Sequence, residues 1–424
     1  MIPLKRIREE TESLKKALAD RGEPAELLDK ILAQDETVRG LMTEVEGLKA
    51  RRNSASAEIG ALKNRGENAD EQIRGLGDLS SRVKALDRQL DQARQALDSD
   101  LLWLPNPPHA SVPVGADASG NVEVARWGAA PQHDFPARDQ HDLMVSLRLV
   151  DFEAGARMSG AGFPLYTGRG ARLERALINF MLDLQTGQNG YEELWPPYLV
   201  RRDAALTTGQ LPKLEADMYL AAQDDLFLIP TAEVPVTNMF KGEVLDEADL
   251  PLKYAAYSAC FRREAGSYGK ESRGLLRVHQ FNKVELVKFT HPDRSYAELE
   301  TLRGDAEEVL RQLGLAYRVV ELCSGDLSFA AAKCYDLELF APVTGRWLEV
   351  SSCSNFVDFQ ARRGNLRFRR SDTGKLDYLH TVNGSGVATP RLMATLLETG
   401  QQKDGAVLIP EALRPYFGSE VIEP

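Results

Sequence analysis

The stretch that decides the fold runs from residue 260 to residue 285 and reads CFRREAGSYGKESRGLLRVHQFNKVE. Period-two patterns on both sides predict strands over 254–262 and 277–289, joined by a Gly-rich, charged loop. Because strand side chains alternate between faces, we expect Arg262 and Glu264 to share one face of the first strand. Two strands that flank a short loop predict a hairpin in an antiparallel sheet.

The second strand of this hairpin carries Arg277, Phe281 and Glu285 at intervals of four, so all three are expected on one face. A sheet face with arginines, a phenylalanine and carboxylates is costly to bury as plain core. Arginine suits phosphates, the aromatic ring suits a stacked base, and the carboxylates suit an amino group. The pattern favours a nucleotide-binding face over a salt-bridged, solvent-exposed hairpin.

A second segment, residues 379–391, reads LHTVNGSGVATPR and precedes apolar residues at helical spacing. It predicts a strand, a small-residue turn and a helix whose first residues are Thr389 and Pro390, which suit a helix start. Arg391 would then lie near the helix N-terminus, where anions bind favourably. An ordinary strand-to-helix connection is the alternative. A third segment, 229–235, places Thr231 and Glu233 two residues apart, which alone indicates little.

The rest of residues 105–424 mixes a predicted helix over 171–187 with further period-two strands such as 347–351. Long loops rather than helical crossovers join these strands, which predicts an antiparallel α+β domain. No GxGxxG or GxxxxGK[ST] loop follows a strand, so doubly wound nucleotide-binding folds are disfavoured.

The first hundred residues show heptad spacing. One apolar series contains Ile31, Val38, Val45 and Ile59 with Leu41, Leu48, Ala55 and Leu62, and a second contains Leu76, Val83, Leu90 and Leu97 with Leu79, Leu86 and Ala93. The polar segment 64–68 separates them, which predicts an antiparallel helical hairpin over about 27–100 whose first helix spans about 38 residues. A coiled coil between two chains is the alternative. Prolines from Pro105 onward end the second helix, so we expect two domains, 1–104 and 105–424.

The chain is acidic overall, with 52 Lys plus Arg, 63 Asp plus Glu and a net charge of −11. That balance argues against a general nucleic-acid coat. A local patch differs: five basic residues face one acid, Glu58, between residues 49 and 65, for a local charge of +4. The five are Lys49, Arg51, Arg52, Lys63 and Arg65. Such a patch suits a phosphate backbone, although a solvated helix face is the alternative.

The cysteines and the N-terminus restrict the class of protein further. The chain has four cysteines and none forms a CxxC pair, which makes a structural zinc site improbable and indicates reduced, mostly buried thiols. The first ten residues have no apolar segment of a signal peptide, and no apolar run approaches the roughly 20 residues that span a bilayer. We therefore expect a cytoplasmic protein without a membrane segment.

Together these segments resemble the bacterial-type seryl-tRNA synthetases, a class II aminoacyl-tRNA synthetase family, over essentially the whole chain. The hairpin at 260–285 resembles motif 2, 383–391 resembles motif 3, and 190–197 (GYEELWPP) after the 171–187 helix resembles the dimer element, motif 1. Further matching segments are Thr231-Ala-Glu233, 208–212 (TGQLP), 273–281 (RGLLRVHQF) and 349–352 (EVSS). The resemblance implies a helical-hairpin arm followed by an antiparallel sheet surrounded by helices.

The resemblance also implies an activity: an ATP-dependent ligase that forms seryl-adenylate from L-serine and ATP, releases pyrophosphate, and transfers serine to the 3′ end of tRNA(Ser). It implies a homodimer, Mg²⁺ as cofactor, and tRNA(Sec) as a second substrate in hosts that have one. Two alternatives are a synthetase paralogue that charges a carrier protein and a non-catalytic RNA-binding relative. The former lack a long arm, and the latter typically lose the arginines; this chain has both.

Residue roles implied by the resemblance fall into four groups. The catalytic cations are Arg262, Arg277 and Arg391. ATP is contacted by Arg262, Arg263, Glu264, Val278, Phe281, Glu349, Val350, Ser351, Ser352 and Arg391, with Glu349 and Ser352 as ligands of Mg²⁺. Serine is contacted by Thr231, Ala232, Glu233, Arg262, Glu285, Asn383 and Ser385. The tRNA is contacted by the arm through Lys49, Arg51, Arg52, Lys63 and Arg65. Val357 and Pro390 depart from the usual family pattern, which leaves the local geometry there open.

Overall fold

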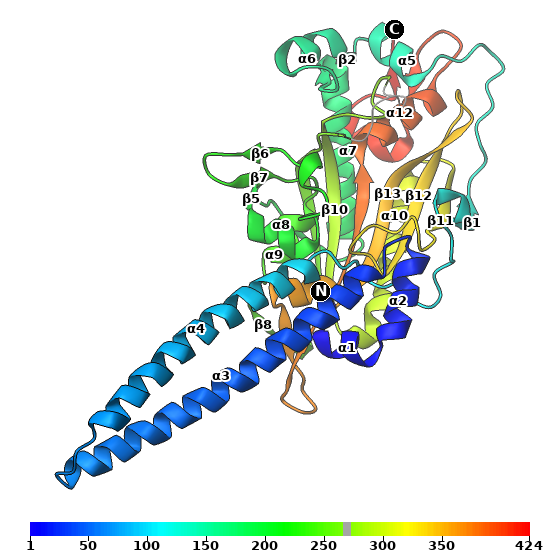
Figure 1. Ribbon diagram of the computed structural model, residues 1–424. Helices are drawn as coiled ribbons and strands as arrows, with labels where there is room; N and C mark the ends of the chain where they lie inside the picture. Colours follow the sequence, from blue (N-terminus) through cyan, green and yellow to red (C-terminus); the bar gives the residue numbers. More distant parts are fainter. Residues whose placement is uncertain (266–272) are drawn as a thin grey trace. The chain divides into compact units, whose positions relative to one another are not determined.

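The computed structural model describes residues 1–265 and 273–424. The charged, Gly-rich loop expected within the 260–285 hairpin falls largely on 266–272 and so lies outside the described residues. The chain divides into two compact units (Figure 1). The first unit contains Met1–Ala19 and Glu23–Pro105, and the second contains Asp20–Gly22 and Asn106–Pro424.

The first unit is helical, with two short helices followed by two long ones: α1 (Leu4–Glu9), α2 (Thr11–Asp20), α3 (Glu26–Asn64) and α4 (Asp70–Leu101). The long helix α3 has 39 residues, close to the predicted 38. Its seam residues Ile31, Val38 and Val45 form one buried cluster with Leu90 and Leu97 of α4. The heptads therefore find their partner within the same chain, and the predicted hairpin is confirmed.

Ion pairs between the two long helices reinforce this antiparallel pairing. Lys30 lies 2.8 Å from Asp100, Arg82 lies 2.9 Å from Glu44, and Lys49 lies 2.8 Å from Asp87. From the first pair to the second, the residue number increases on α3, from 30 to 44, and decreases on α4, from 100 to 82. This opposite order is what an antiparallel hairpin requires. Exposed pairs of this kind each contribute less than about 1 kcal/mol, so the apolar seam supplies most of the stability and the charges mainly specify the register.

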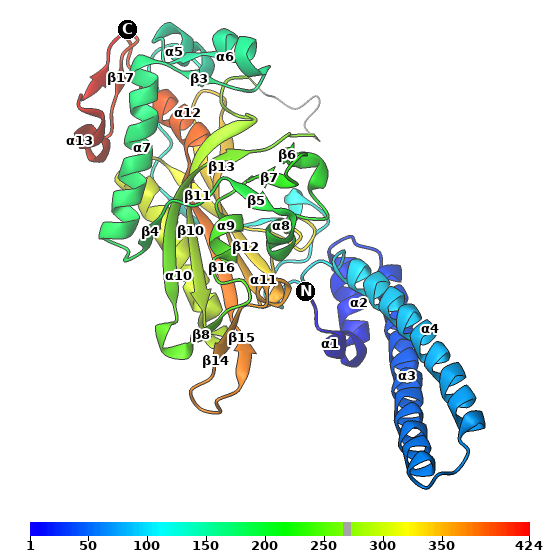
Figure 2. The ribbon, with the colours of Figure 1, turned by 90° about the vertical axis from the view of Figure 1, so that its left-hand side faces the viewer.

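The second unit is built on an eight-stranded sheet with the order β1-β11-β12-β13-β16-β10-β9-β4 (Figure 2). All neighbouring strands are antiparallel except β4 and β9, which are parallel. The strands are β1 (Val122–Trp127), β4 (Glu192–Leu194), β9 (Leu252–Phe261), β10 (Gln280–Thr290), β11 (Tyr317–Glu321), β12 (Lys333–Ala341), β13 (Arg346–Val357) and β16 (His380–Ala388). The predicted antiparallel α+β domain is confirmed.

The helices of this unit and its small strands surround the main sheet. The helices are α5 (Gln140–Ser146), α6 (Phe152–Ser159), α7 (Gly168–Gly187), α8 (Arg202–Thr208), α9 (Glu233–Asn238), α10 (Ser295–Gln312), α11 (Phe359–Gly364), α12 (Thr389–Gly400) and α13 (Arg414–Phe417). The small sheets pair β2 (Val150–Asp151) with β3 (Leu165–Tyr166), β17 (Val407–Leu408) with β18 (Val421–Ile422), β5 (Leu199–Arg201) and β6 (Leu220–Ala221) with β7 (Leu226–Leu228), and β8 (Val244–Asp246) and β15 (Leu376–Tyr378) with β14 (Arg367–Arg369).

Strand β10 shows that one face of the sheet packs into the apolar core while the other face lines a polar cavity. Val284 and Leu286 are fully buried in a core that also contains residues of α7, α10 and α12. Phe281, Lys283 and Glu285 alternate with them and line a cavity on the opposite face. The side with α7, α10 and α12 is thus the apolar backing that holds the polar face in place.

Two predicted strand ends are wrong. The first hairpin strand ends at Phe261, so Arg262 and Glu264 follow it, and Glu264 has a left-handed φ of 53°. The second strand begins at Gln280, so Arg277 precedes it. Period two continues along the sequence past Phe261 and before Gln280, but the backbone pairing ends with the bond from the Arg262 N–H to the His279 carbonyl, and periodicity alone cannot mark where the pairing stops.

The predicted small-residue turn within 379–391 is also wrong. Residues His380–Ala388 form one continuous strand, β16, between β13 and β10. Its small residues serve close packing, because a Cβ on Gly384 would lie 2.5 Å from Leu302 Cδ2 and 2.7 Å from Cys353 Sγ. The helix start is confirmed, since α12 begins at Thr389 with Pro390 in its first turn. No helix in the described ranges is long and apolar enough to cross a membrane.

Candidate active site

A cavity of about 620 Å³ opens on the polar face of the main sheet. It gathers most of the residues to which the sequence assigned a role, from strands, loops and helices far apart in the chain. Those that line it are Thr231, Glu233, Arg262, Glu264, Arg277, Val278, Phe281, Glu285, Glu349, Val350, Ser352, Asn383, Ser385 and Arg391. Arg277 therefore reaches the same cavity as Phe281 and Glu285, although it does so from a loop.

Three of the residues assigned to ATP or serine do not line the cavity. Arg263 donates from Nε to the carbonyl of Met218 at 2.9 Å and lies over the ring of Tyr219, 4.7 Å from its centroid. Ser351 is buried and its hydroxyl donates to the carbonyl of Ser385 at 2.5 Å. Ala232 is fully buried in an apolar cluster. These side chains have structural contacts, so a role in binding would have to come from their main-chain groups.

One half of the cavity is rich in guanidinium groups. The guanidinium of Arg262 lies over Phe281, 5.1 Å from the ring centroid, and the Arg262 N–H donates to the His279 carbonyl at 2.9 Å. Arg277 forms an ion pair with Glu264 at 2.9 Å. An aromatic ring next to an arginine offers a stacking surface beside positive charge, which suits a nucleoside with phosphates.

The third arginine of this half comes from the first turn of α12. Arg391 donates to the carbonyl of Glu349 at 2.8 Å and lies 3.6 Å from the Glu349 carboxylate. The position at a helix N-terminus adds the partial positive charge of the helix dipole to that of the side chain. Arg262, Arg277 and Arg391 thus surround one space, as the sequence indicated.

A β-bulge brings Glu349 and Ser352 together. In the pairing of β12 with β13, Leu337 lies opposite Ser351 whereas Glu338 lies opposite Glu349, so Val350 is an extra residue. Without the bulge, residues three apart would point to opposite faces of the strand. With it, both Glu349 and Ser352 line the cavity. Their carboxylate and hydroxyl oxygens are hard ligands of the type that Mg²⁺ prefers, so they fit that ion.

The other half of the cavity is a buried polar pocket. Thr231 donates to Glu285 Oε2 at 2.9 Å, and Gln360 Nε2 donates to Glu233 Oε1 at 2.6 Å. Burial, together with the nearby charge of Glu285, raises the pKa of Glu233 to about 7, although the hydrogen bond from Gln360 and the charge of Lys283 oppose that rise. Such a pocket suits a small ligand that carries an ammonium group and a hydroxyl.

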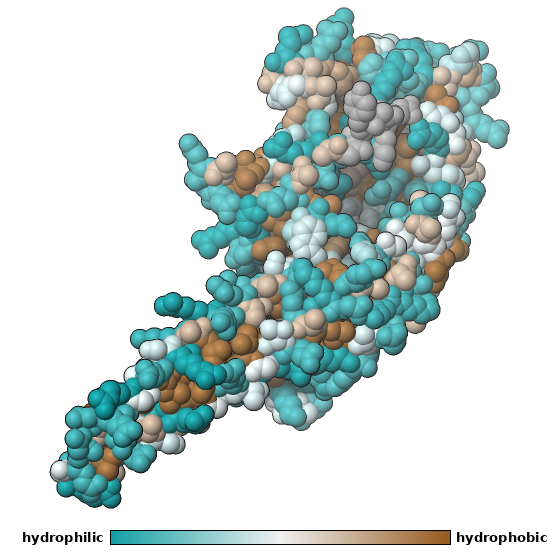
Figure 3. All heavy atoms as spheres, viewed as in Figure 1, coloured by the Kyte–Doolittle hydropathy of each residue, from teal (hydrophilic) through white to brown (hydrophobic). Residues whose placement is uncertain are grey.

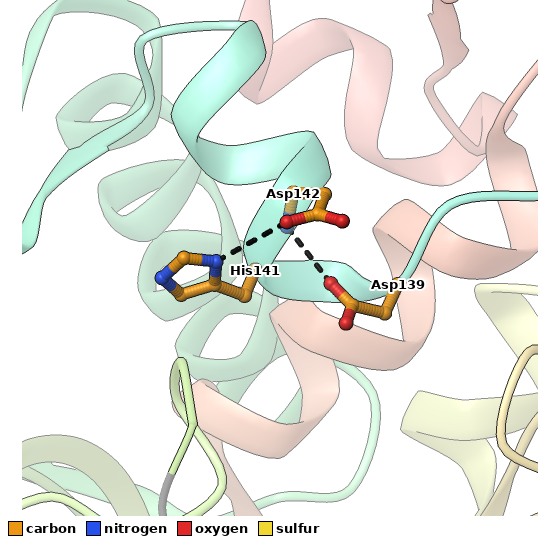
Figure 4. A group of neighbouring side chains, drawn as sticks. All are labelled: Asp139, His141 and Asp142. Atoms are coloured by element: carbon orange, nitrogen blue, oxygen red, sulfur yellow. Dashed lines mark hydrogen bonds and ion pairs between the residues drawn. The ribbon is translucent and has the colours of Figure 1, made fainter.

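A separate group of titratable side chains, Asp139, His141 and Asp142, lies at the start of α5 (Figure 4). Both carboxylates pair with Arg273, and the distance to Asp142 is 2.6 Å. Gln140 between them accepts from the Leu275 N–H at 3.2 Å and donates to the Arg273 carbonyl at 2.9 Å. These contacts hold the segment just before Arg277 against the start of α5. The two carboxylates are already neutralised by Arg273, which disfavours a metal ion there.

The basic patch of the arm lies along the distal part of α3, where Figure 3 shows a largely hydrophilic surface. Lys49 pairs with Asp87 at 2.8 Å and Arg65 pairs with Glu67 at 3.0 Å. Among the described residues, no ion pair is found for the remaining three, Arg51, Arg52 and Lys63. The charges of these three side chains are therefore available to an anionic partner.

Sequence reasoning missed two buried polar residues next to the pocket. Lys283 lines the cavity between Phe281 and Glu285, and the same period of two that selected its neighbours could have found it. Gln360 comes from α11, donates to Glu233 and accepts from Thr381 at 2.7 Å. No local pattern around Gln360 marks it, because its role depends on the packing of α11 against β16.

Comparison with known proteins finds family matches for both the helical N-terminal part and the catalytic part of the chain. Residues 1–108 match the family model described as the seryl-tRNA synthetase N-terminal domain, and 218–400 match the tRNA synthetase class II core domain (G, H, P, S and T). Two relatives with the name serine–tRNA ligase come from Caldicellulosiruptor bescii, 54% identical over 423 residues (100% of each chain), and from Geobacter sulfurreducens, 51% identical over 418 residues (99% of each).

Solved structures show the same likeness. Seryl-tRNA synthetase from Pyrococcus horikoshii, complexed with ATP, superposes with a TM-score of 0.94 at 37% identity, covering 100% of both chains. The cytoplasmic serine–tRNA ligase from Naegleria fowleri, in complex with AMP, has a TM-score of 0.85 at 27% identity and covers 97% of this chain and 95% of its own. The chain therefore belongs to the seryl-tRNA synthetase family, with a class II catalytic fold.

Proposed function

We propose that this protein activates L-serine with ATP and transfers it to tRNA(Ser). The observation that carries the proposal is the cavity itself, in which three arginines adjoin a buried pocket of carboxylates and hydroxyls. The full-length likeness to proteins with the name serine–tRNA ligase supports it, and so does the likeness to a seryl-tRNA synthetase solved with ATP. A paralogue that charges a carrier protein is disfavoured, because the relatives match the arm as well as the core.

In the first step, a serine carboxylate oxygen attacks the α-phosphorus of ATP. A new P–O bond forms to the carboxylate, the bond to the bridging oxygen breaks, and pyrophosphate leaves with that electron pair. The nucleophile is already an anion, so the protein needs no base. Its task is to align the reactants and to neutralise charge, which Arg262 does at the α-phosphate and Arg277 and Arg391 do at the leaving pyrophosphate.

ATP recognition uses the remaining residues of the guanidinium-rich half. Phe281 stacks on the adenine, Glu264 accepts from its amino group, and Val278 offers main-chain contacts. Arg263, Val350 and Ser351 contribute through the main chain, since the side chains of Arg263 and Ser351 are held elsewhere. Glu349 and Ser352 would hold Mg²⁺, which would supply positive charge at the phosphate oxygens.

Serine is selected by the buried pocket that contains Thr231, Glu233, Glu285, Asn383 and Ser385. Ala232 contributes to this pocket only through its main-chain groups. A pocket that is built to hydrogen-bond a hydroxyl rejects alanine strongly, because alanine leaves buried polar groups without partners. Added bulk on a larger amino acid is excluded by the buried walls. Threonine and alanine are therefore the informative competitors.

In the second step, a 3′-terminal ribose hydroxyl of the tRNA attacks the seryl carbonyl. The ester bond forms, the bond from the carbonyl carbon to the phosphate oxygen breaks, and AMP leaves with that electron pair while the hydroxyl proton passes to the released phosphate. We propose residues 1–104 as the tRNA-binding domain, with Lys49, Arg51, Arg52, Lys63 and Arg65 contacting phosphates of the nucleic acid. The same contacts would serve tRNA(Sec) in a host that makes one. Because charged tRNA is consumed in protein synthesis, we also propose the cytoplasm as the location.

We further propose a homodimer that uses the motif 1 element at 190–197. Its Trp195 is 71% exposed, and nearby Leu199 is 46% exposed, an unusual exposure for large apolar side chains. The expected mass in sedimentation equilibrium is twice the 47.0 kDa of the chain. A monomer mass at micromolar concentration would contradict this part of the proposal.

The test of the activity is ATP–pyrophosphate exchange with each amino acid in turn, followed by aminoacylation of tRNA(Ser). We expect exchange with serine, and exchange with threonine or alanine lower by at least about 100-fold. Exchange that is independent of serine would contradict the proposed substrate. Serine-dependent exchange with transfer to a carrier protein but not to tRNA would favour the paralogue instead.

A further inference from the structure

We propose that Lys283 is a positioning residue for serine, which holds Glu285 and Thr231 in the geometry that accepts the amino acid. This inference rests on the proposed function and deepens it, because it names what orders the serine pocket. Lys283 lies on β10 between Phe281 and Glu285, is 6% exposed, and lines the cavity. A buried lysine beside a substrate pocket needs a reason, since burying an ammonium group is costly.

The contacts of Lys283 are confined to the pocket. Its Nζ pairs with Glu285 Oε2, and it also donates to Thr231 Oγ1 at 3.0 Å. The side chains of Lys283 and Glu285 are 7% and 2% exposed, so solvent barely screens the pair. Lys283 is thus the ammonium that compensates a carboxylate in the buried half of the cavity.

The hydrogen-bond inventory shows how Lys283 orients Thr231. The Thr231 hydroxyl oxygen accepts from Lys283 and from the Glu233 N–H at 3.2 Å, so its own proton is directed to Glu285 Oε2 at 2.9 Å. Both Lys283 and Thr231 therefore act on the same oxygen of Glu285. No hydrogen bond to the other oxygen, Oε1, is found among residues 1–265 and 273–424, and Oε1 is the acceptor left for serine.

Removal of the Lys283 ammonium group would remove both its ion pair with Glu285 and its hydrogen bond to Thr231. Glu285 would then lose its cation while its charge still acts on Glu233, and Thr231 would lose one of the two donors that fix its hydroxyl. The guanidinium-rich half has its own pairs, Arg277 with Glu264 and Arg391 with Glu349. Loss of Lys283 should therefore weaken serine binding selectively and leave ATP binding largely unchanged.

The experiment compares three variants of the full-length protein in ATP–pyrophosphate exchange. Lys283→Met keeps the length of the side chain without its charge, and we expect the KM for serine to rise about 100-fold while the KM for ATP changes less than about threefold. Lys283→Arg keeps a cation, so its KM for serine should be at least about tenfold lower than that of Lys283→Met. Lys288→Met is the matched control, because Lys288 is a 1% exposed lysine on the same strand that pairs with Glu298 outside the cavity.

The inference is overturned if Lys283→Met leaves the KM for serine within threefold of the parent value, or if the KM values for serine and ATP rise together. It is equally overturned if Lys288→Met produces the same selective loss. If Lys283→Met does not fold, Lys283→Gln decides, because it keeps a polar side chain at the same position without the positive charge and should show the same serine-selective loss. Absence of serine-dependent exchange in the parent protein would instead contradict the proposed function.

Discussion

Replacement of Arg262 by alanine is expected to lower serine-dependent ATP–pyrophosphate exchange at least about 1,000-fold without unfolding the protein. The guanidinium lies over Phe281, 5.1 Å from the ring centroid, and lines the cavity. Positive charge at a transferring phosphoryl group typically contributes 10³–10⁵ to the rate. Removal should therefore affect kcat as well as both KM values, measured by initial rates of exchange.

The control for this experiment is Arg126→Ala on the edge strand β1. Arg126 also lies over an aromatic ring, Trp347, at 5.0 Å, but it does not line the cavity. Both variants lose an arginine from an aromatic face, so they should show similar small changes in thermal stability. Near-normal exchange by Arg262→Ala, or an equal loss in Arg126→Ala, would refute the assignment of Arg262.

Simultaneous reversal of Arg51, Arg52 and Lys63 to glutamate is expected to raise the KM for tRNA(Ser) about 100-fold or more and to leave serine-dependent exchange intact. These cations lack ion-pair partners among the described residues, so they are available to phosphates. Reversal replaces attraction by repulsion, and the effect should shrink as salt rises, because phosphate contacts release counterions. Aminoacylation rates at several salt concentrations measure both effects.

The matched control reverses three exposed cations of the second unit, Arg369, Lys375 and Lys403, for the same change in net charge. It should change the KM for tRNA far less than the arm variant does. Similar losses in both triple variants would show that net charge alone governs tRNA binding. Loss of exchange in the arm variant would show that the arm is needed for activation and would contradict the proposed division of labour.

Local patterns in the sequence were sufficient for the architecture. Heptad spacing predicted the hairpin α3–α4, because an apolar residue every 3.5 positions can only be buried along one seam. Period two predicted the central strands β9 and β10, because alternation is a property of the strand itself. The residues at 260–285 were also sufficient to indicate a nucleotide-binding face, and the family resemblance added the serine site.

Other features depended on pairing between segments far apart in the chain. The predicted end of β9 was wrong by one residue and the predicted start of β10 by three, and the small-residue part of the strand β16 was taken for a turn. The bulge at Val350 places Glu349 and Ser352 in one cavity, and nothing in the EVSS segment reveals it. The side chain of Arg263 is held at Met218 and Tyr219, a contact that only the folded chain creates.

The sequence by itself determined the helical arm, the antiparallel sheet, the family and most of the residues around the cavity, since these follow from local periodicity and from motifs. Only the tertiary structure decided that the Arg263 side chain lies outside the cavity, how the bulge aligns Glu349 with Ser352, and how Lys283 comes to hold Glu285 and Thr231. The physical reason is that strand register is set by long-range hydrogen bonds and core packing, and a shift of one residue moves a side chain to the opposite face of the sheet.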